Sequence, residues 1–316
     1  MSAIKARHFA PPGAGSRKPM TTTAAELVQL LDLETLEDNL FRGLNPPESW
    51  PFRTRVFGGQ VLAQALVAAQ RTVEGSAAHS MHAYFLLGGD PAVPIVYDVE
   101  RVRDGRSFAT RRTVAIQHGR PIFIMSVSFH REEAGLDHQL DLEVVVPSPE
   151  EVPGLGELPA SVLDRLPAPV RDYWMRPRPI ELKPIGLGER RAAPRRAVWF
   201  RTTGPLPDDA GVHRAVLAYA TDMTLLEATT LVHGTSVLGG DIQAASLDHA
   251  LWLHRPFRAD DWLLYTQDSP SASGARGLAR GLIYDRAGRL IASVAQEGLI
   301  RPVAPAPEAP STQASA

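Results

Sequence analysis

An acid, a hydroxyl and a carboxamide distinguish the C-terminal third of this chain from its N-terminal third. The three residues are Asp222, Ser246 and Gln296. Side chains of these kinds can accept, donate and relay hydrogen bonds to a reacting molecule. A duplicated fold that keeps its core in both copies but gains polar groups in one is expected to carry its chemistry there. We therefore look for a site in the C-terminal copy.

The comparison depends on an internal repeat. Ser126-Val127 aligns with Ser293-Val294 at an offset of 167 residues, 293 − 126, and at this offset His82 falls on His249. Both copies then contain a short apolar helix followed by alternating strands. The positions that change are Phe129 to Gln296, His79 to Ser246 and, with a small gap, Gly58-Gly59 to Thr221-Asp222.

The composition bounds the class of protein. With 316 residues, of which 44% are hydrophobic and 22% charged, the chain is globular and long enough for two domains of ordinary size. Its formal net charge of −2 argues against nucleic acid or an anionic membrane as the main partner. It contains no cysteine, which excludes disulfides, a thiolate nucleophile and cysteine-ligated metals and fits a reducing cytoplasm.

The two ends of the chain are expected to lie outside the fold. Residues 1–21 and 302–316 are rich in Pro, Gly, Ala or Ser, and we expect both segments to be disordered. The first lacks the continuous apolar stretch of a signal peptide, and no segment approaches about 18 uninterrupted apolar residues. We therefore expect a soluble, cytoplasmic protein without membrane insertion.

The remaining sequence predicts the same order of elements twice. In the first copy we expect helices at 22–31 and 60–71 and strands at 79–87, 95–104, 108–117 and 121–130. In the second we expect strands at 180–185 and 197–203, a helix at 222–231, and strands at 244–254, 262–269, 277–284 and 290–300. The stretch 33–42 fits either a strand or a short helix.

This order predicts an α+β protein with the hotdog fold in tandem, in which two antiparallel sheets each wrap a central helix. We place the N-terminal hotdog repeat at 22–130 and the C-terminal repeat, with the polar residues, at 177–301. The acidic, proline-rich stretch 131–176 connects them.

Five segments in one order resemble the acyl-CoA thioesterase II family, and the resemblance spans about residues 25–301. Any one segment alone is a weak signal, but five together are specific. They are Phe57-Gly58-Gly59-Gln60, Ser80-Met81-His82-Ala83-Tyr84-Phe85-Leu86, Ser246-Leu247-Asp248-His249-Ala250-Leu251-Trp252-Leu253-His254-Arg255-Pro256-Phe257, Ala275-Arg276-Gly277 and Ala295-Gln296-Glu297-Gly298.

The resemblance implies hydrolysis of fatty acyl-CoA to a free fatty acid and coenzyme A, with no metal or redox cofactor. Thioester hydrolysis needs an oriented water, an acceptor for its proton and donors for the oxyanion. In this family an Asp, a Thr and a Gln hold the water, and the matching positions are Asp222, Ser246 and Gln296. Ser246 departs from the usual Thr but keeps the hydroxyl.

Strand and helix geometry supports the same three residues. Side chains alternate along a strand, so Ala292, Val294 and Gln296 share one face, which corresponds to the face of Met125, Val127 and Phe129 in the first copy. If that face packs on its helix, Gln296 points at the second helix. We expect Asp222 in the first turn of that helix, where free N–H groups and the dipole stabilise a carboxylate and could receive the oxyanion.

Two other kinds of site are disfavoured. A triad of Ser246, Asp248 and His249 lacks the Gly-x-Ser-x-Gly elbow, and alternation turns Ser246 and Asp248 away from His249. Because His249 repeats His82, we expect a structural histidine common to both copies. The closest histidine pair, His79 and His82, has an odd spacing on a strand, so there is no case for a metal site.

Two other functions stay open. A hotdog enoyl-CoA hydratase needs a catalytic Asp-His pair on one helix, but Glu227 stands five residues after Asp222. A catalytically silent acyl-CoA-binding protein could keep the fold, although it need not keep all three polar residues.

Coenzyme A binding and assembly are less specified. Arginines that recur near the repeats could meet the phosphates of coenzyme A, although most exposed arginines are simply solvated. They are Arg101, Arg103, Arg111, Arg112, Arg276 and Arg280. Exposed sheet edges favour further association, so we expect a homo-oligomer, a dimer or a tetramer.

Overall fold

The computed structural model describes residues 23–46, 55–142, 145–154, 157–158, 160–164, 168–186, 195–237 and 241–303. The predicted disorder of 1–21 and of 304–316 falls outside the described residues. The last described residues of the predicted tail, 302 and 303, continue from the final strand.

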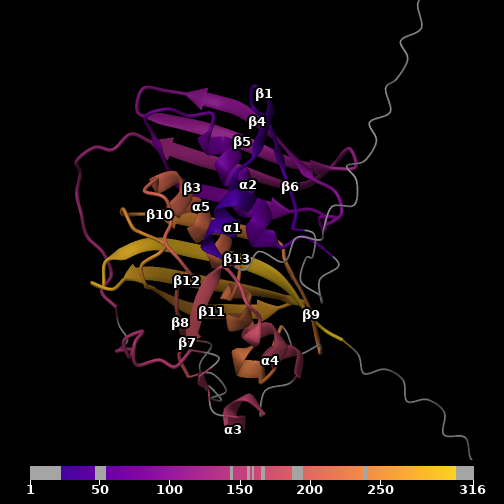
Figure 1. Ribbon diagram of the computed structural model, residues 1–316, viewed down its shortest axis with the longest axis vertical. Coiled ribbons are helices and arrows are strands. Elements are labelled where there is room, and N and C mark those ends of the chain that lie inside the picture. Colours follow the sequence, from indigo (N-terminus) through magenta and orange to yellow (C-terminus); the bar gives the residue numbers. More distant parts are fainter. Residues whose placement is uncertain are drawn as a thin grey trace, which may run out of the picture.

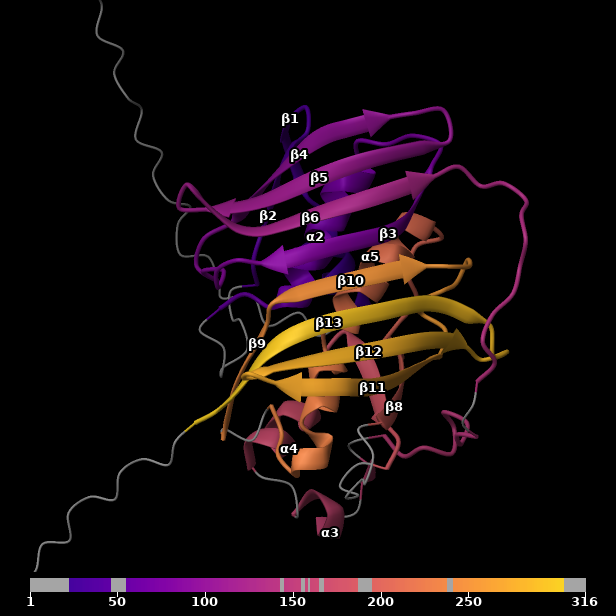
Figure 2. The same ribbon diagram turned by 180° about the vertical axis from the view of Figure 1, so that it is seen from behind.

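One antiparallel sheet of 13 strands runs through both halves of the chain (Figures 1 and 2). Its strand order is β1-β2-β4-β5-β6-β3-β10-β13-β12-β11-β8-β7, and β9 pairs with β13 beside this path. The two halves meet in the middle, where β3 pairs with β10. The sheet curves around helices α2 and α5, so the predicted tandem hotdog, an α+β fold, is confirmed.

The N-terminal half comprises α1 (Ala24–Leu31), β1 (Glu34–Glu37), β2 (Leu40–Gly43), α2 (Gly58–Gln70), β3 (Ala77–Phe85), β4 (Ile95–Asp104), β5 (Phe108–Gln117) and β6 (Arg120–His130). The predicted first helix is confirmed, because Thr23 and Glu26 form its capping box. The ambiguous stretch 33–42 is a hairpin of the two short strands β1 and β2.

The remaining elements are α3 (Ala160–Leu163), α4 (Ala168–Met175), β7 (Ile180–Pro184), β8 (Arg195–Thr202), α5 (Ala210–Thr221), the 3₁₀ helices η2 (Leu225–Thr229) and η3 (Leu231–His233), β9 (Ile242–Ser246), β10 (Asp248–Leu253), β11 (Leu263–Ser273), β12 (Arg276–Asp285) and β13 (Leu290–Pro302).

Helices α2 and α5 pack against each other in opposite directions at the centre of the core. At one end the Gln70 Nε2 donates to the Gly211 carbonyl at 3.3 Å. At the other end the start of α2 lies so close to α5 that a Cβ on Gly59 would come within 2.5 Å of the Tyr219 carbonyl oxygen. The start of α2 therefore adjoins the end of α5, and this arrangement decides what surrounds the C-terminal polar residues.

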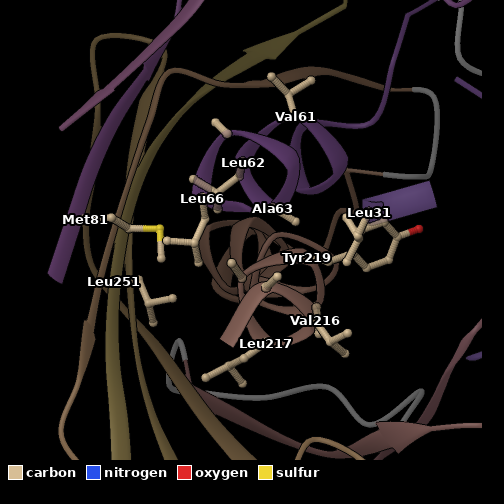
Figure 3. Close-up of a cluster of buried hydrophobic side chains, with 14 of the residues drawn as sticks. Leu31, Val61, Leu62, Ala63, Leu66, Met81, Val216, Leu217, Tyr219 and Leu251 are labelled. Carbon is tan, nitrogen blue, oxygen red and sulfur yellow. The ribbon is translucent and has the colours of Figure 1, made fainter. Parts of the chain in front are cut away.

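The apolar faces of the two helices meet the middle strands (Figure 3). Met81 from β3 and Leu251 from β10 point toward the helices, where Leu66 and Leu217 are also fully buried. Burying a side chain of this size stabilises the fold by roughly 1.5–3 kcal/mol. The sheet and the helix pair thus form a continuous core across both repeats.

The predicted helix at 222–231 is wrong. The central helix of the second half is α5, which begins after Asp209, whose side chain caps the Gly211 N–H, and ends at Thr221. Asp222 is the C-terminal capping residue of this helix and not part of its first turn. Gly58-Gly59 begins α2 whereas Thr221-Asp222 ends α5, so the two pairs are not equivalent.

The register of the strands corrects the repeat alignment. Val127 pairs with Met81 and Val294 pairs with Leu251. If the two valines are equivalent at an offset of 167 residues, then strands β3 and β10 correspond at a different offset, 251 − 81 = 170 residues. The equivalence of His82 and His249 is therefore wrong.

Burial agrees with this correction. His82 is exposed and its ring contacts that of Trp252 on the outer face of the sheet, whereas His249 is completely buried. The correspondence of His79 with Ser246 fails as well, because His79 lies within β3 whereas Ser246 is the last residue of β9.

The strand predicted at 244–254 is broken at Leu247. The Leu247 N–H donates to the Glu297 carbonyl, and its own carbonyl accepts from Phe85. Strands β9 and β10 on either side both pair with β13, but only β10 also pairs with β3. The break ends the regular alternation of side chains between Ser246 and His249.

One helical stretch, Ala210–His233, is long and apolar enough to cross a membrane by length and composition. Of its most apolar 18-residue segment, 72% is buried inside the protein. It contains α5, so its apolar character is explained by its place in the core.

Candidate active site

Asp222 receives two hydrogen bonds from the other two predicted residues. Its Oδ1 accepts from the Gln296 Nε2 at 2.6 Å and from the Ser246 Oγ at 3.1 Å. The structure thus brings together three side chains separated by 24 and 50 residues in sequence, 246 − 222 and 296 − 246. Because both donors are directed to Oδ1, Oδ2 is left without a donor among the described residues.

Strand β13 directs Gln296 to this position as predicted. Ala292, Val294 and Gln296 are all buried on the face toward the helices, and their counterparts Met125, Val127 and Phe129 are buried in the same way. Gln296 pairs with Ala279, just as Phe129 pairs with Ala109, so the Phe129-to-Gln296 substitution is confirmed by the register.

The Gln296 carboxamide is completely buried, and its Oε1 has no hydrogen-bond partner among the described residues. An ionised carboxylate can only accept, so the amide nitrogen must face Asp222 and the amide oxygen must face elsewhere. A buried acceptor without a partner is unfavourable by about 1–3 kcal/mol. Gln296 is therefore ready to accept a hydrogen bond from a small donor such as water.

The helix start at this site belongs to α2, in the other half of the chain. A Cβ on Gly58 would come within 2.7 Å of the Asp222 Oδ2 and within 3.0 Å of the Phe85 ring. The predicted helix N-terminus beside Asp222 is thus present, but α2 of the N-terminal half supplies it.

The N–H groups at the start of α2 are available. In the first turn of a helix these groups have no partner inside the helix. Gln60 donates to the Phe57 carbonyl, but the N–H groups of Gly58 and Gly59 make no hydrogen bond within the described residues. The free donors and the positive end of the dipole of α2 therefore adjoin the carboxylate.

A buried histidine adjoins the same helix end. The His249 Nε2 lies 3.0 Å from the Thr221 Oγ1, and the Tyr265 hydroxyl donates to the Thr221 carbonyl at 3.4 Å. Burial lowers the pKa of His249 to about 4, partly opposed by the charge of Asp222. Sequence reasoning assigned His249 a purely structural role, and only the break between β9 and β10 reveals how close it lies to the site.

The triad of Ser246, Asp248 and His249 does not form. The Ser246 Oγ donates to Asp222, and the Asp248 Oδ1 accepts the Glu297 N–H at 2.6 Å. The alternation argument against this triad fails at the strand break, since Ser246 and His249 both point to the end of α5. What separates them is that they bind different residues there.

Glu227, at the position where a hydratase needs histidine, is engaged away from Asp222. Its Oε2 accepts the Val237 N–H at 3.1 Å, and burial raises the pKa of this carboxyl. Within the described ranges, no group of three or more His, Cys, Asp or Glu side chains is placed to hold a metal ion.

The arginines considered for phosphate binding are mostly paired. Arg112 lies 3.5 Å from Glu100, Arg276 3.0 Å from Glu297 and Arg280 2.9 Å from Asp268. Arg111 is buried and bound to Thr72 and Asp104, so it cannot meet a ligand at the surface.

Comparisons with known proteins identify the family. A family model described as "Acyl-CoA thioesterase" matches residues 171–299, and one described as "Acyl-CoA thioesterase N-terminal domain" matches residues 46–130. Human acyl-coenzyme A thioesterase 8 is 38% identical over 92% of this chain and 93% of its own length.

Two solved structures give the same result. The crystal structure of an acyl-CoA thioesterase II, TesB2, from Mycobacterium marinum is 40% identical, with a TM-score of 0.72 over 88% of this chain and 99% of its own. A protein of unknown function with the hot dog fold from Alicyclobacillus acidocaldarius shares the fold at 20% identity and a TM-score of 0.71, covering 88% of this chain and 98% of its own.

Fold and relatives together define the class, which is that of the hotdog thioester hydrolases. Within this class the chain belongs to the acyl-CoA thioesterase family, since its relatives match nearly the whole described chain.

Proposed function

We propose that this protein hydrolyses fatty acyl-CoA to a free fatty acid and coenzyme A through a water that Asp222 activates with the help of Ser246 and Gln296. The observation that carries the proposal is the convergence of Gln296 Nε2 and Ser246 Oγ on one oxygen of Asp222, which leaves the other oxygen facing the start of α2.

Each group then has a role. The water donates one proton to Asp222 Oδ2 and is oriented by Gln296 Oε1, the buried acceptor without a partner. Ser246 and the Gln296 amide nitrogen fix the carboxylate through Oδ1. The free N–H groups of Gly58 and Gly59 receive the carbonyl oxygen, whose negative charge grows as water adds.

The reaction balances without a cofactor. The water oxygen bonds to the thioester carbon while its proton passes to Asp222, and the tetrahedral intermediate carries the negative charge on oxygen. The carbon–sulfur bond then breaks, and the proton from Asp222 is returned to the departing thiolate. The products are the fatty acid and coenzyme A, and Asp222 is ready for another turnover.

The site extends across both repeats in this proposal. The acid, hydroxyl and amide come from the C-terminal half, and the oxyanion donors come from the N-terminal half. This differs from the expectation that one helix of the second half supplies both the acid and the donors. The antiparallel packing of α2 and α5 supports it.

Thiol release from palmitoyl-CoA tests the proposal. We expect the wild type to release coenzyme A and Asp222→Ala to lose about 10³-fold in kcat, within the range for removing a general base. Asp209→Asn is the matched control, because it removes a carboxylate at the far end of α5 while an Asn still caps the helix.

The outcomes separate the function classes. A silent acyl-CoA-binding protein would release no thiol in any variant, and a hydratase would hydrate an enoyl-CoA without releasing thiol. Equal turnover by the wild type and Asp222→Ala would refute the assigned base.

We also propose a cytoplasmic homo-oligomer, a dimer or a tetramer. The absence of cysteine supports a reducing compartment, and exposed edge strand β1 supports further association. Light scattering of the purified protein gives the mass directly, and a single-chain mass would refute the oligomer.

A further inference from the structure

His249 and Gln296 are neighbours on the buried face of the sheet. Ala250 pairs with Ala295, so the residue before Ala250 lies beside the residue after Ala295 on the adjacent strand. His249 and Gln296 are both completely buried, and both face the end of α5. There they bind consecutive residues, His249 the side chain of Thr221 and Gln296 that of Asp222.

Proton counting fixes the direction of the histidine contact. The Thr221 hydroxyl has one proton, which it donates to the Ala218 carbonyl at 2.9 Å. The short contact with His249 at 3.0 Å therefore requires the imidazole to donate from Nε2 to the Thr221 oxygen. Nδ1 then keeps its lone pair, in agreement with its having no hydrogen-bond partner among the described residues.

The neutral state of the imidazole suits this role. Burial lowers the pKa of His249 to about 4, and Asp222 is the charged group that acts on it in the opposite direction. At neutral pH the ring thus carries a single proton, on Nε2. Since the ring is uncharged, it does not neutralise the Asp222 carboxylate, which remains available as a base.

We infer that His249 is a positioning residue for hydrolysis, holding the end of α5 through Thr221 so that the carboxylate of Asp222 meets Gln296 and Ser246. Without this hydrogen bond, the side chain of Thr221 loses its link to the sheet and only the contact of the Tyr265 hydroxyl with the Thr221 carbonyl remains, so Asp222 is held less firmly against its donors. The inference rests on the proposed function, because it assigns His249 to the same carboxylate. It concerns orientation alone, as His249 does not touch the reacting atoms.

Two isosteric substitutions test it. A Gln carboxamide can place an N–H near the position of Nε2, whereas an Asn carboxamide reaches only the position of Nδ1. We therefore expect His249→Asn to lower kcat by about 10²-fold, the scale of a misplaced catalytic group, with KM unchanged within about 2-fold. His249→Gln should recover kcat to within about 10-fold of the wild type.

Substitution of Thr221 removes the same hydrogen bond at its acceptor. Thr221→Val keeps the branched shape but removes the acceptor oxygen, and it should reproduce the kcat loss of His249→Asn. If the two residues act through one hydrogen bond, the double variant loses no more than either single variant. Thr221→Val also provides the test if His249→Asn does not fold. His82→Asn, on the outer face, is the histidine control.

The outcomes are distinguishable. A wild type that releases no thiol overturns the proposed function, and this inference with it. A working wild type whose His249→Asn and Thr221→Val variants keep normal kcat overturns the inference alone. The inference is also overturned if His249→Asn and His249→Gln lose kcat equally, with equal losses of Tm. That pattern indicates a packing role for His249 and not positioning through a hydrogen bond.

Discussion

The two central helices end in opposite charges. Helix α2 ends at Arg71, a cation, and α5 ends at Asp222, an anion. A cation is favourable at the negative C-terminal end of a helix dipole and an anion is not. The N-terminal half thus follows the rule for stability, while the C-terminal half breaks it at the residue proposed to do the chemistry.

The surroundings of the two helix ends differ in the same sense. At the end of α2, buried Arg111 donates to the hydroxyl and the carbonyl of Thr72, at 2.8 and 3.1 Å. The register places Gly281 at the corresponding position, because Arg111 pairs with Val127 as Gly281 pairs with Val294. In the second half the Tyr265 ring takes this place, since a Cβ on Gly281 would clash with it, and the Tyr265 hydroxyl donates to the Thr221 carbonyl at 3.4 Å. A buried cation at the end of α2 thus corresponds to a neutral hydroxyl at the end of α5.

Phe129 and Gln296 complete the contrast. The first half has an aromatic ring where the second has a carboxamide, and both are completely buried. One helix end is closed by Arg111 and Phe129, and the other has a carboxylate, two donors and an acceptor without a partner. A duplicated fold can therefore hold one site and keep the related position for stability.

The first contrast is the response to acid expected from the buried histidine at the end of α5. The pKa of His249 is lowered from 6.5 to about 4 by burial, so between these values the unfolded chain binds a proton and the folded chain does not. The free energy of unfolding should therefore fall as the pH drops from about 6.5 to about 4 and level off below. Above 6.5 this group has no effect.

Its size follows from the shift, at about 3 kcal/mol for a fully buried ring. Urea unfolding of the wild type and of His249→Gln across this pH range isolates the contribution, because the other titrating groups are common to both. If the free energy of unfolding falls equally with pH in the two proteins, the lowered pKa assigned to His249 is refuted.

The second contrast is between Gln296 and Phe129. Gln296→Ala should lower kcat by about 10²-fold, the scale for one lost polarising group. Phe129→Ala should leave the kcat of the folded protein unchanged but cost about 3–5 kcal/mol of stability, because it opens a cavity. Steady-state kinetics and urea unfolding on the same samples check both, and a kcat loss at Phe129 would break the distinction between the halves.

The third contrast concerns Arg111. Arg111→Met leaves the buried Thr72 carbonyl and the partly buried Arg103 carbonyl without this donor, so we expect a loss of about 2 kcal/mol in the free energy of unfolding. The kcat should not change. Thermal unfolding monitored alongside thiol release measures the two effects, and an unchanged Tm would show that Arg111 does not stabilise the end of α2.

The smallest contrast is between the two helix starts. A Cβ on Gly58 would press on the Asp222 Oδ2 at 2.7 Å, so Gly58→Ala should displace the carboxylate and lower kcat by about 10-fold. At the start of α5, a Cβ on Gly211 would approach no atom closer than 3.1 Å, that of Asp209. Gly211→Ala should therefore keep its kcat, and equal effects at the two glycines would contradict this account.

The sequence predicted the polar trio because two simple regularities hold for it. Strand alternation fixes the face of Gln296, and comparison with Phe129 shows that this face is otherwise apolar. The family resemblance then identified Asp222 and Ser246, which the structure brings within hydrogen-bond distance of each other.

What the sequence could not provide is the neighbourhood of Asp222. A constant offset between repeats fails because residues 223–241, with two 3₁₀ helices, separate α5 from the next strand. The helix start beside Asp222 comes from a residue 164 positions earlier, 222 − 58, through antiparallel helix packing that no local pattern encodes. The contact of His249 with Thr221 could not be predicted for a similar reason, since the break at Leu247 depends on pairing with other strands.

The central claim, that Asp222 activates a water and does not itself attack the thioester, is tested by a single turnover in ¹⁸O-labelled water. With enzyme in excess over palmitoyl-CoA, mass spectrometry should find one ¹⁸O atom in the fatty acid and none in the peptide that contains Asp222. An unlabelled first-turnover product with ¹⁸O in the Asp222 carboxylate would contradict the account, because it requires an acyl-enzyme intermediate on that residue.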